Sequence, residues 1–159
     1  MKPAPFDYHR ASSVDEACAL LAQHGADARL IAGGQSLVPM MAMRLTRPSV
    51  LVDINEIDAL KFVLAESTYV HTGACTRQCV ALRDDVLGKQ VPLVRKALAW
   101  VGHVQTRNRG TLGGSLAHAD PAAELPLVAC TLNANLQVRS QSGMRAIPAS
   151  EFFAGPLTT

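Results

Sequence analysis

Aromatic side chains and concentrated basic charge are scarce in this sequence. It has one Trp, two Tyr and four Phe in 159 residues, and its 15 Lys and Arg are dispersed, for a formal net charge of only +2. Nucleic-acid-binding domains depend on aromatic stacking platforms or on a concentrated basic surface. The composition therefore argues against a nucleic-acid partner.

Long apolar runs are lacking as well. A membrane-spanning helix needs ~20 consecutive apolar residues, and the richest apolar stretch is interrupted by Pro39, Arg44 and Arg47. No secretory leader is recognisable, and the four cysteines include no C-x-x-C pair. We therefore expect a soluble protein of the reducing cytoplasm, without a membrane span.

Signatures of direct bond chemistry are a third absence. The sequence contains no G-x-S-x-G, no H-E-x-x-H and no His and carboxylate pair at metal spacing. Cys75 and Cys79 lie four residues apart, but no other ligand pattern accompanies them, so we expect free thiols. His118 and Asp120 could act as a base and its orienting group, although residues two apart rarely bond to each other. We therefore predict no catalytic residue and no bound metal.

The sequence does contain two glycine-rich motifs, at residues 32–37 and 111–115, each with adjacent glycines beside hydroxyl side chains. Each follows an apolar stretch that predicts a strand, and residues 36–44 predict a short helix after the first motif. Glycine lacks a Cβ, so its backbone N–H can approach an anion closely. A single Gly-Gly turn is as often purely structural. Two such motifs favour a clamp around a ligand with two phosphates, for which FAD is the candidate.

The remaining pattern predicts an α+β protein with two lobes. Ser13 and Glu16 have the spacing of a capping box and predict a helix that Gly25 ends. We expect residues 1–56 to form a small N-terminal α/β lobe and residues 57–159 a larger lobe with a mixed sheet. Strands are predicted over residues 28–32, 50–54, 62–65, 69–72, 134–139 and 145–147.

Three further helices are predicted in the larger lobe, over residues 77–82, 87–101 and 121–131. Pro92 is expected in the first turn of the second of these, where proline is tolerated. Asp120 is expected to cap the third, with Pro121 at its first position. Asp120 and Glu124 follow the second glycine motif, where carboxylates can accept hydrogen bonds from the sugar hydroxyls of a dinucleotide.

The two motifs, taken at full length, resemble a known protein family. A-G-G-Q-S-L-V-P at residues 32–39 and T-L-G-G-S-L-A-H-A-D-P-A-A-E at residues 111–124 are similar to the FAD-binding medium subunit of the molybdenum hydroxylases. That family includes the flavoprotein subunits of carbon monoxide dehydrogenase and xanthine dehydrogenase. Further matches lie at residues 73–77, 107–110 and 152–159, so the likeness spans essentially the whole chain.

The resemblance implies a PCMH-type FAD-binding fold, with FAD between the lobes and one glycine motif from each lobe around its pyrophosphate. It also implies that Glu124 stands where many relatives have an acid that bonds to the cofactor, with Asp120 just ahead of it. Ser115 stands where several relatives have Asn. The cofactor-binding residues predicted in this way are Ala32, Gly33, Gly34, Gln35, Ser36, Leu37, Thr111, Leu112, Gly113, Gly114, Ser115, Asp120 and Glu124.

The function implied by the resemblance is that of an oxidoreductase component, in which FAD passes electrons from iron–sulfur clusters to an external acceptor. The implied partners are an iron–sulfur small subunit and a molybdopterin large subunit. Relatives continue into a third, C-terminal domain that these 159 residues do not contain. Two alternatives remain open: a stand-alone FAD-dependent reductase or oxidase, and a nucleotide-binding assembly module that has lost its flavin.

Overall fold

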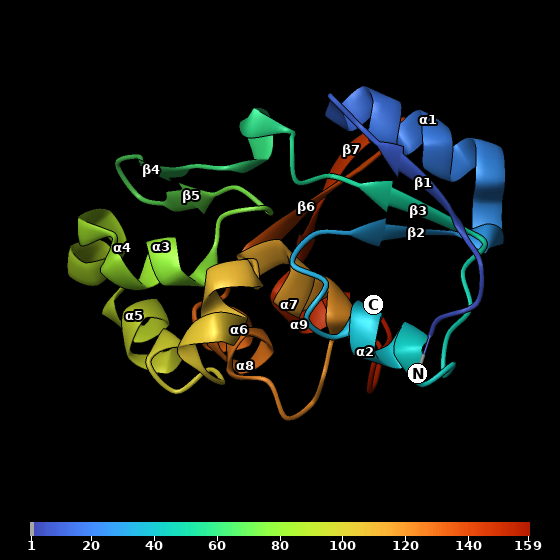
Figure 1. The fold of residues 1–159 in the computed structure, drawn as a ribbon. Coiled ribbons are helices and arrows are strands. Elements are labelled where there is room, and N and C mark those ends of the chain that lie inside the picture. The colour runs from blue at the N-terminus through green and yellow to red at the C-terminus, as the bar shows by residue number, and fades with distance from the viewer. Residues whose placement is uncertain (1) are drawn as a thin grey trace.

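A three-stranded parallel sheet carries the first glycine motif (Figure 1). The computed structural model describes residues 2–159. The strands are β1 (Asp7–Arg10), β2 (Ala28–Ile31) and β3 (Val50–Asp53), in the order β1-β3-β2. All four residues of β3 are buried, because a central parallel strand is covered on both faces and has a neighbour at each edge. The first glycine motif directly follows the end of β2 and lies near the end of β3.

Helix α1 (Val14–His24) packs on this sheet with the predicted signals at both ends. The hydroxyl of Ser13 accepts from the amide of Glu16 at 3.1 Å, and Gly25, with φ 54°, ends the helix. The predicted helix is therefore confirmed. The second half of the capping box differs, because the Glu16 carboxylate accepts from the amide of Ser12 at 2.8 Å and not from that of Ser13.

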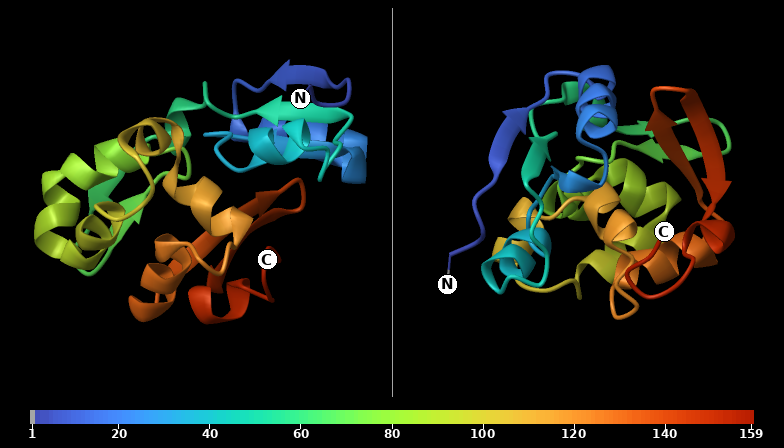
Figure 2. Two further views of the ribbon diagram at one scale, coloured as in Figure 1. Left: turned by 60° about the horizontal axis from the view of Figure 1, so that its bottom comes forward. Right: turned by 90° about the vertical axis from the view of Figure 1, so that its right-hand side faces the viewer.

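The structure also confirms the two predicted strand pairs. β4 (Val63–Ala65) and β5 (Val70–Thr72) form an antiparallel hairpin, as do β6 (Asn135–Ser140) and β7 (Gly143–Pro148). The second hairpin returns to the N-terminal part of the chain and lies beside α1 (Figure 2). There Arg139 Nη2 lies 2.8 Å from Asp15 Oδ1. Residues 124 positions apart in the sequence are thus in contact.

The predicted helix over residues 87–101 is interrupted, which corrects the sequence interpretation. The structure has α4 (Asp85–Gln90) and α5 (Pro92–Leu98), separated at Val91, whose φ is −133°. Proline has no N–H to continue a helix, and its ring disfavours the helical conformation of the preceding residue. Pro92 is therefore the first residue of a new helix and not part of the first turn of a longer one.

The second glycine motif does not follow a strand, contrary to the prediction. It is preceded by α6 (Val104–Arg109) and forms the start of α7 (Leu112–His118). Asp120 does not cap the next helix either, because α8 (Glu124–Thr131) begins after Ala123. The remaining helical segments are α2 (Leu37–Ala42), α3 (Gln78–Arg83), α9 (Ala149–Phe152) and the 3₁₀ turns η1 (Gly25–Asp27) and η2 (Asp58–Leu60).

Two hydrophobic cores hold these elements together. The first lies between the parallel sheet and α1, and the second lies among the helices of the central part of the chain and includes Leu112 of the second glycine motif. Within residues 2–159, no helix combines the length and apolar character needed to span a bilayer. The residues of the first core are Ala11, Ala17, Ala28, Val50, Val52, Ile54, Ile57 and Cys75, and those of the second are Ala81, Leu87, Leu98, Leu112 and Leu125.

Candidate functional site

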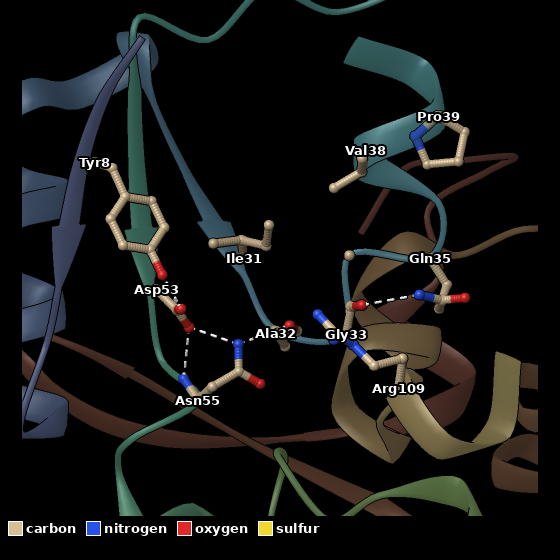
Figure 3. Close-up of a pocket in the computed structure, with 11 residues that line it drawn as sticks. Tyr8, Ile31, Ala32, Gly33, Gln35, Val38, Pro39, Asp53, Asn55 and Arg109 are labelled. Atoms are coloured by element: carbon tan, nitrogen blue, oxygen red, sulfur yellow. Dashed lines mark hydrogen bonds between the residues drawn. The ribbon is translucent and has the colours of Figure 1, made fainter. Parts of the chain in front are cut away.

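The first glycine motif lines a cavity of about 370 Å³ where β2 and β3 end (Figure 3). The carboxyl ends of parallel strands are the usual place for a ligand in an α/β sheet. The motif supplies one side of this cavity, and the strands supply the other. The lining residues are Tyr8, Ile31, Ala32, Gly33, Gly34, Gln35, Val38, Pro39, Asp53, Asn55 and Arg109.

Unpaired backbone N–H groups distinguish this motif. Among the described residues, no hydrogen-bond acceptor is in range of the amides of residues 33–37. Gly34 has a φ of +70°, a conformation that favours glycine and turns the chain at the cavity. Consecutive amides that converge in such a turn bind anions. The motif therefore fits an anionic group such as a phosphate.

Gly33 is required by packing as well as by access to its amide. A Cβ at this position would lie 2.8 Å from Gly110 Cα and closer still to the carbonyl oxygen of Arg109. Backbone atoms cannot move aside as the end of a flexible side chain can. The absence of a side chain at Gly33 thus brings the first motif against residues 109 and 110, directly before the second motif.

Polar side chains that line the cavity hold the backbone of the first motif in place. Asn55 Nδ2 donates to the carbonyl oxygen of Ala32 at 2.8 Å, and the backbone N–H of Asn55 donates to Asp53 Oδ1 at 2.8 Å. The Tyr8 hydroxyl donates to the other oxygen of Asp53 (Figure 3). These contacts connect β1, β3 and the first residue of the motif.

Asp53 remains ionised near neutral pH although it is buried. Burial raises the pKa of this carboxyl group, but hydrogen bonds from Tyr8 and Asn55 together outweigh burial and hold the pKa below its ordinary value. The same contact raises the pKa of Tyr8, chiefly because the hydroxyl donates to Asp53 and burial adds to the effect. The Tyr8–Asp53 hydrogen bond thus contributes to both pKa shifts, lowering that of Asp53 and raising that of Tyr8.

The backbone amides of residues 112–115 in the second motif already donate hydrogen bonds within the protein. Gly113 donates to the carbonyl oxygen of Ala74 at 2.9 Å, and Gly114 donates to the Thr111 hydroxyl oxygen at 3.0 Å, which makes Thr111 the N-cap of α7. Leu112 and Ser115 also donate to backbone carbonyls. Free N–H groups are thus absent from residues 112–115, and the side-chain donors of the motif are the hydroxyl of the buried Thr111 and that of Ser115.

The structure separates the predicted site residues into two sets. Residues 32–35 line the cavity, and residues 36 and 37 continue its row of free amides. Residues 111–115 do not line it, and the residues directly before them, 109 and 110, lie against Gly33. Asp120 accepts from the amide of Ala122 at 2.9 Å, and Glu124 is the half-buried first residue of α8. Neither carboxylate lines the cavity.

Three of the lining residues, Tyr8, Asp53 and Asn55, had no role in the sequence-based prediction. Asp53 is the last residue of the buried parallel strand β3, and Asn55 lies just beyond it; polar residues at that position are a usual signal of a ligand site. Tyr8 gave no signal of its own, because its role depends on the pairing of β1 with β3, in which it lies opposite Leu51.

Residues that could hold a metal are not gathered at this site. Within residues 2–159, no group of three or more His, Cys, Asp or Glu side chains lies close enough together to hold an ion. All four cysteines are free thiols, and burial raises the pKa of the Cys75 thiol. The arrangement is therefore suited to binding and orienting an anionic ligand.

Comparisons with known proteins show the family of this chain. Residues 4–159 match the family model described as the FAD binding domain in molybdopterin dehydrogenase. The chain is 48% identical over 151 residues to the alpha subunit of the 6-hydroxypseudooxynicotine dehydrogenase complex of Paenarthrobacter nicotinovorans, covering 95% of this chain and 51% of that protein. It is 39% identical over 159 residues to the carbon monoxide dehydrogenase medium chain of Hydrogenophaga pseudoflava, covering 100% of this chain and 55% of that one.

Solved structures show the same fold. Carbon monoxide dehydrogenase from Hydrogenophaga pseudoflava superimposes with a TM-score of 0.98 at 40% identity, over 100% of this chain and 55% of that chain. Quinoline 2-oxidoreductase from Pseudomonas putida 86 superimposes with a TM-score of 0.97 at 42% identity, over the same shares. The α+β fold and the family resemblance predicted from the sequence are therefore confirmed, and the chain spans about half the length of the relatives it matches. With the cavity, its free amides and these likenesses in agreement, the chain belongs to the family of FAD-binding domains of molybdopterin dehydrogenases.

Proposed function

We propose that this chain binds FAD by placing the pyrophosphate on the free amides of residues 33–37. The observation that carries the proposal is the row of unpaired N–H groups beside a cavity at the ends of two parallel strands. When bound, FAD supplies the redox chemistry, and the protein supplies binding and orientation. Gly33 admits the backbone of residues 109 and 110, while Asn55 holds the Ala32 carbonyl in place.

The second motif is proposed to contribute hydroxyl groups. The Thr111 oxygen accepts from Gly114, which leaves its hydroxyl hydrogen available to donate, and Ser115 offers a second hydroxyl. In this arrangement FAD lies between a lobe of residues 1–56 and a lobe of residues 57–159. Asp120 and Glu124 then serve the ribose or ribityl hydroxyls and not the phosphates.

We further propose that the bound FAD passes electrons from iron–sulfur clusters to an external acceptor, within a complex that also has an iron–sulfur small subunit and a molybdopterin large subunit. The support is that the relatives are named as a complex subunit and a medium chain. A cytoplasmic location belongs to the same proposal and agrees with the four free thiols.

A charge placed beside the amides tests the FAD site. Ser36 is exposed and precedes α2, where Asp and Asn are both well-tolerated capping residues. Ser36→Asp puts a carboxylate next to the free N–H groups, and we expect it to weaken FAD binding at least about tenfold, by repelling the phosphates. Ser36→Asn has nearly the same shape without the charge and is expected to bind FAD close to the wild-type affinity.

The titration also distinguishes the alternatives. FAD binding that is equal in the wild type, S36D and S36N would contradict the assignment of the pyrophosphate to this motif. Parallel titrations use FMN and ADP. Binding of ADP with no further gain from the flavin half is the result expected of a module that has lost its flavin. Steady NADH oxidation by the chain alone would favour a stand-alone reductase.

A further inference from the structure

The side chain of Arg77 donates hydrogen bonds to residues next to both glycine motifs. Arg77 is the residue directly before α3, and its Nη2 donates to Asn55 Oδ1 at 2.6 Å. Its Nη1 donates to the carbonyl oxygen of Arg109. One guanidinium thus reaches a residue that supports the first motif and a residue that leads into the second.

The orientation of Asn55 makes the first of these contacts specific. The Asn55 Nδ2 group donates to the Ala32 carbonyl oxygen and to Asp53 Oδ1, so both amide hydrogens are used. The Oδ1 atom is then the remaining polar atom of this side chain, and it can only accept. This atom requires a hydrogen-bond donor, and the Arg77 guanidinium supplies it.

The second contact of Arg77 is made where Gly33 lies against residues 109 and 110. The carbonyl oxygen of Arg109 that accepts from Arg77 is the same atom that lies against Gly33. The backbone of Arg77 also pairs with Thr111 in an isolated antiparallel bridge. Arg77 therefore contacts the cap of the second motif through its backbone and the neighbours of the first motif through its side chain.

We propose that Arg77 is a positioning residue that fixes the first glycine motif relative to residues 109–111 and so sets the affinity of the site for FAD. The planar guanidinium presents two donors in fixed directions, and two acceptors are in place for them. A lysine keeps the charge but carries it at one point, so it cannot hold both acceptors in the same geometry. The affinity part of this inference rests on the proposed FAD site, whereas the positioning part concerns the free protein.

The positioning part is tested without ligand by ¹⁵N NMR of the 159-residue chain. Arg77→Lys is compared with Arg83→Lys, an exposed arginine at the end of α3 that lines no part of the cavity. We expect the amide signals of Gly33 and Gly34 to move in R77K and to stay in place in R83K. Unmoved signals in R77K would overturn the proposal.

The affinity part is tested by FAD titration of R77K, Asn55→Ala and the double variant. We expect R77K to lose FAD affinity about tenfold, as for a hydrogen bond to a charged group, with R83K unchanged. Because one of the two contacts of Arg77 is made with Asn55, the double variant should lose less FAD affinity than the product of the two single losses. This coupling is a readout that general destabilisation would not produce.

Each outcome bears on one part of the inference. Wild-type affinity in R77K would overturn it, and so would a double variant whose loss is the product of the two single losses, because Arg77 would then act independently of Asn55. If the wild type binds no FAD while the Gly33 signal still moves in R77K, the positioning role stands and the proposed function fails.

Discussion

At the residue scale, the absence of a side chain matters most at Gly33. The sequence drew attention to this glycine because of phosphate binding. The structure adds a second reason, the close approach of the backbone of residues 109 and 110. That contact joins residues 76 positions apart, so no local pattern could have revealed it.

Gly33→Ala is expected to destabilise the protein by about 1–3 kcal/mol, as overpacking against backbone does. A matched control is Gly155→Ala, because a Cβ at Gly155 would meet no atom within 4 Å. Urea unfolding of the two variants measures the difference. A G33A protein as stable as G155A would show that the first motif does not pack against residues 109 and 110 in solution.

Tyr8→Phe is expected to lower the free energy of unfolding by about 1 kcal/mol near neutral pH, because Asp53 loses a hydrogen-bond donor. The lowered pKa of Asp53 stabilises the folded state above the ordinary pKa of an aspartate, and this contribution is lost as the pH falls through the folded-state pKa. Y8F should therefore differ from the wild type near pH 7, and the difference should shrink toward pH 3.

The control for this change is Tyr69→Phe, since Tyr69 is exposed and its hydroxyl makes no hydrogen bond among the described residues. Unfolding by urea between pH 3 and pH 7 provides the measurement. A stability difference between Y8F and the wild type that stays constant over this range would show that the Tyr8 contact does not control the ionisation of Asp53.

At the element scale, the structure changes the meaning of the second glycine motif. Its Gly-Gly pair occurs inside the first turn of α7, where Thr111 caps the helix, and not in an open loop after a strand. Thr111→Val removes the capping oxygen at nearly constant volume and should cost about 1 kcal/mol of stability, whereas Thr111→Ser keeps the cap.

Urea unfolding and hydrogen exchange at the Gly114 amide test this prediction together. We expect faster exchange of that amide in T111V and wild-type exchange in T111S, because the Gly114 amide donates to the Thr111 hydroxyl. Equal stability and equal exchange in the two variants would argue against the cap.

Most strands and helix α1 could be predicted from the sequence, but the helix start near Asp120 could not. Strands β2 to β7 and α1 were predictable because local signals define them: alternating or continuous apolar residues, the Ser13 cap and the Gly25 end. Strand β1, with the sequence D-Y-H-R, has no such pattern and was not predicted. Asp120 was assigned as a cap because of the Asp-Pro pair, yet it forms a turn with Ala122 and the helix starts later. The Asp-Pro pair is compatible with a turn as well as with a helix start, so the sequence alone did not distinguish the two arrangements.

At the scale of the whole molecule, the family resemblance predicted the fold and the cofactor, and residues 32–35 do line the cavity. The polar set of Tyr8, Asp53 and Asn55 could not be assembled from the sequence, because its members come from β1 and from the end of β3, strands that are brought together only by the parallel pairing. The pairing of strands distant in the sequence thus assembles polar residues that no local motif could identify as one group.

The central claim is that the free amides of residues 33–37 hold the pyrophosphate of FAD, and ¹⁵N NMR of the chain titrated with FAD tests it most directly. Charge-assisted hydrogen bonds to phosphate should produce the largest amide shifts at these residues, saturating with FAD concentration. The Gly113 amide, already paired with Ala74, should move little. Saturable FAD binding that leaves the amides of residues 33–37 unmoved would contradict the account.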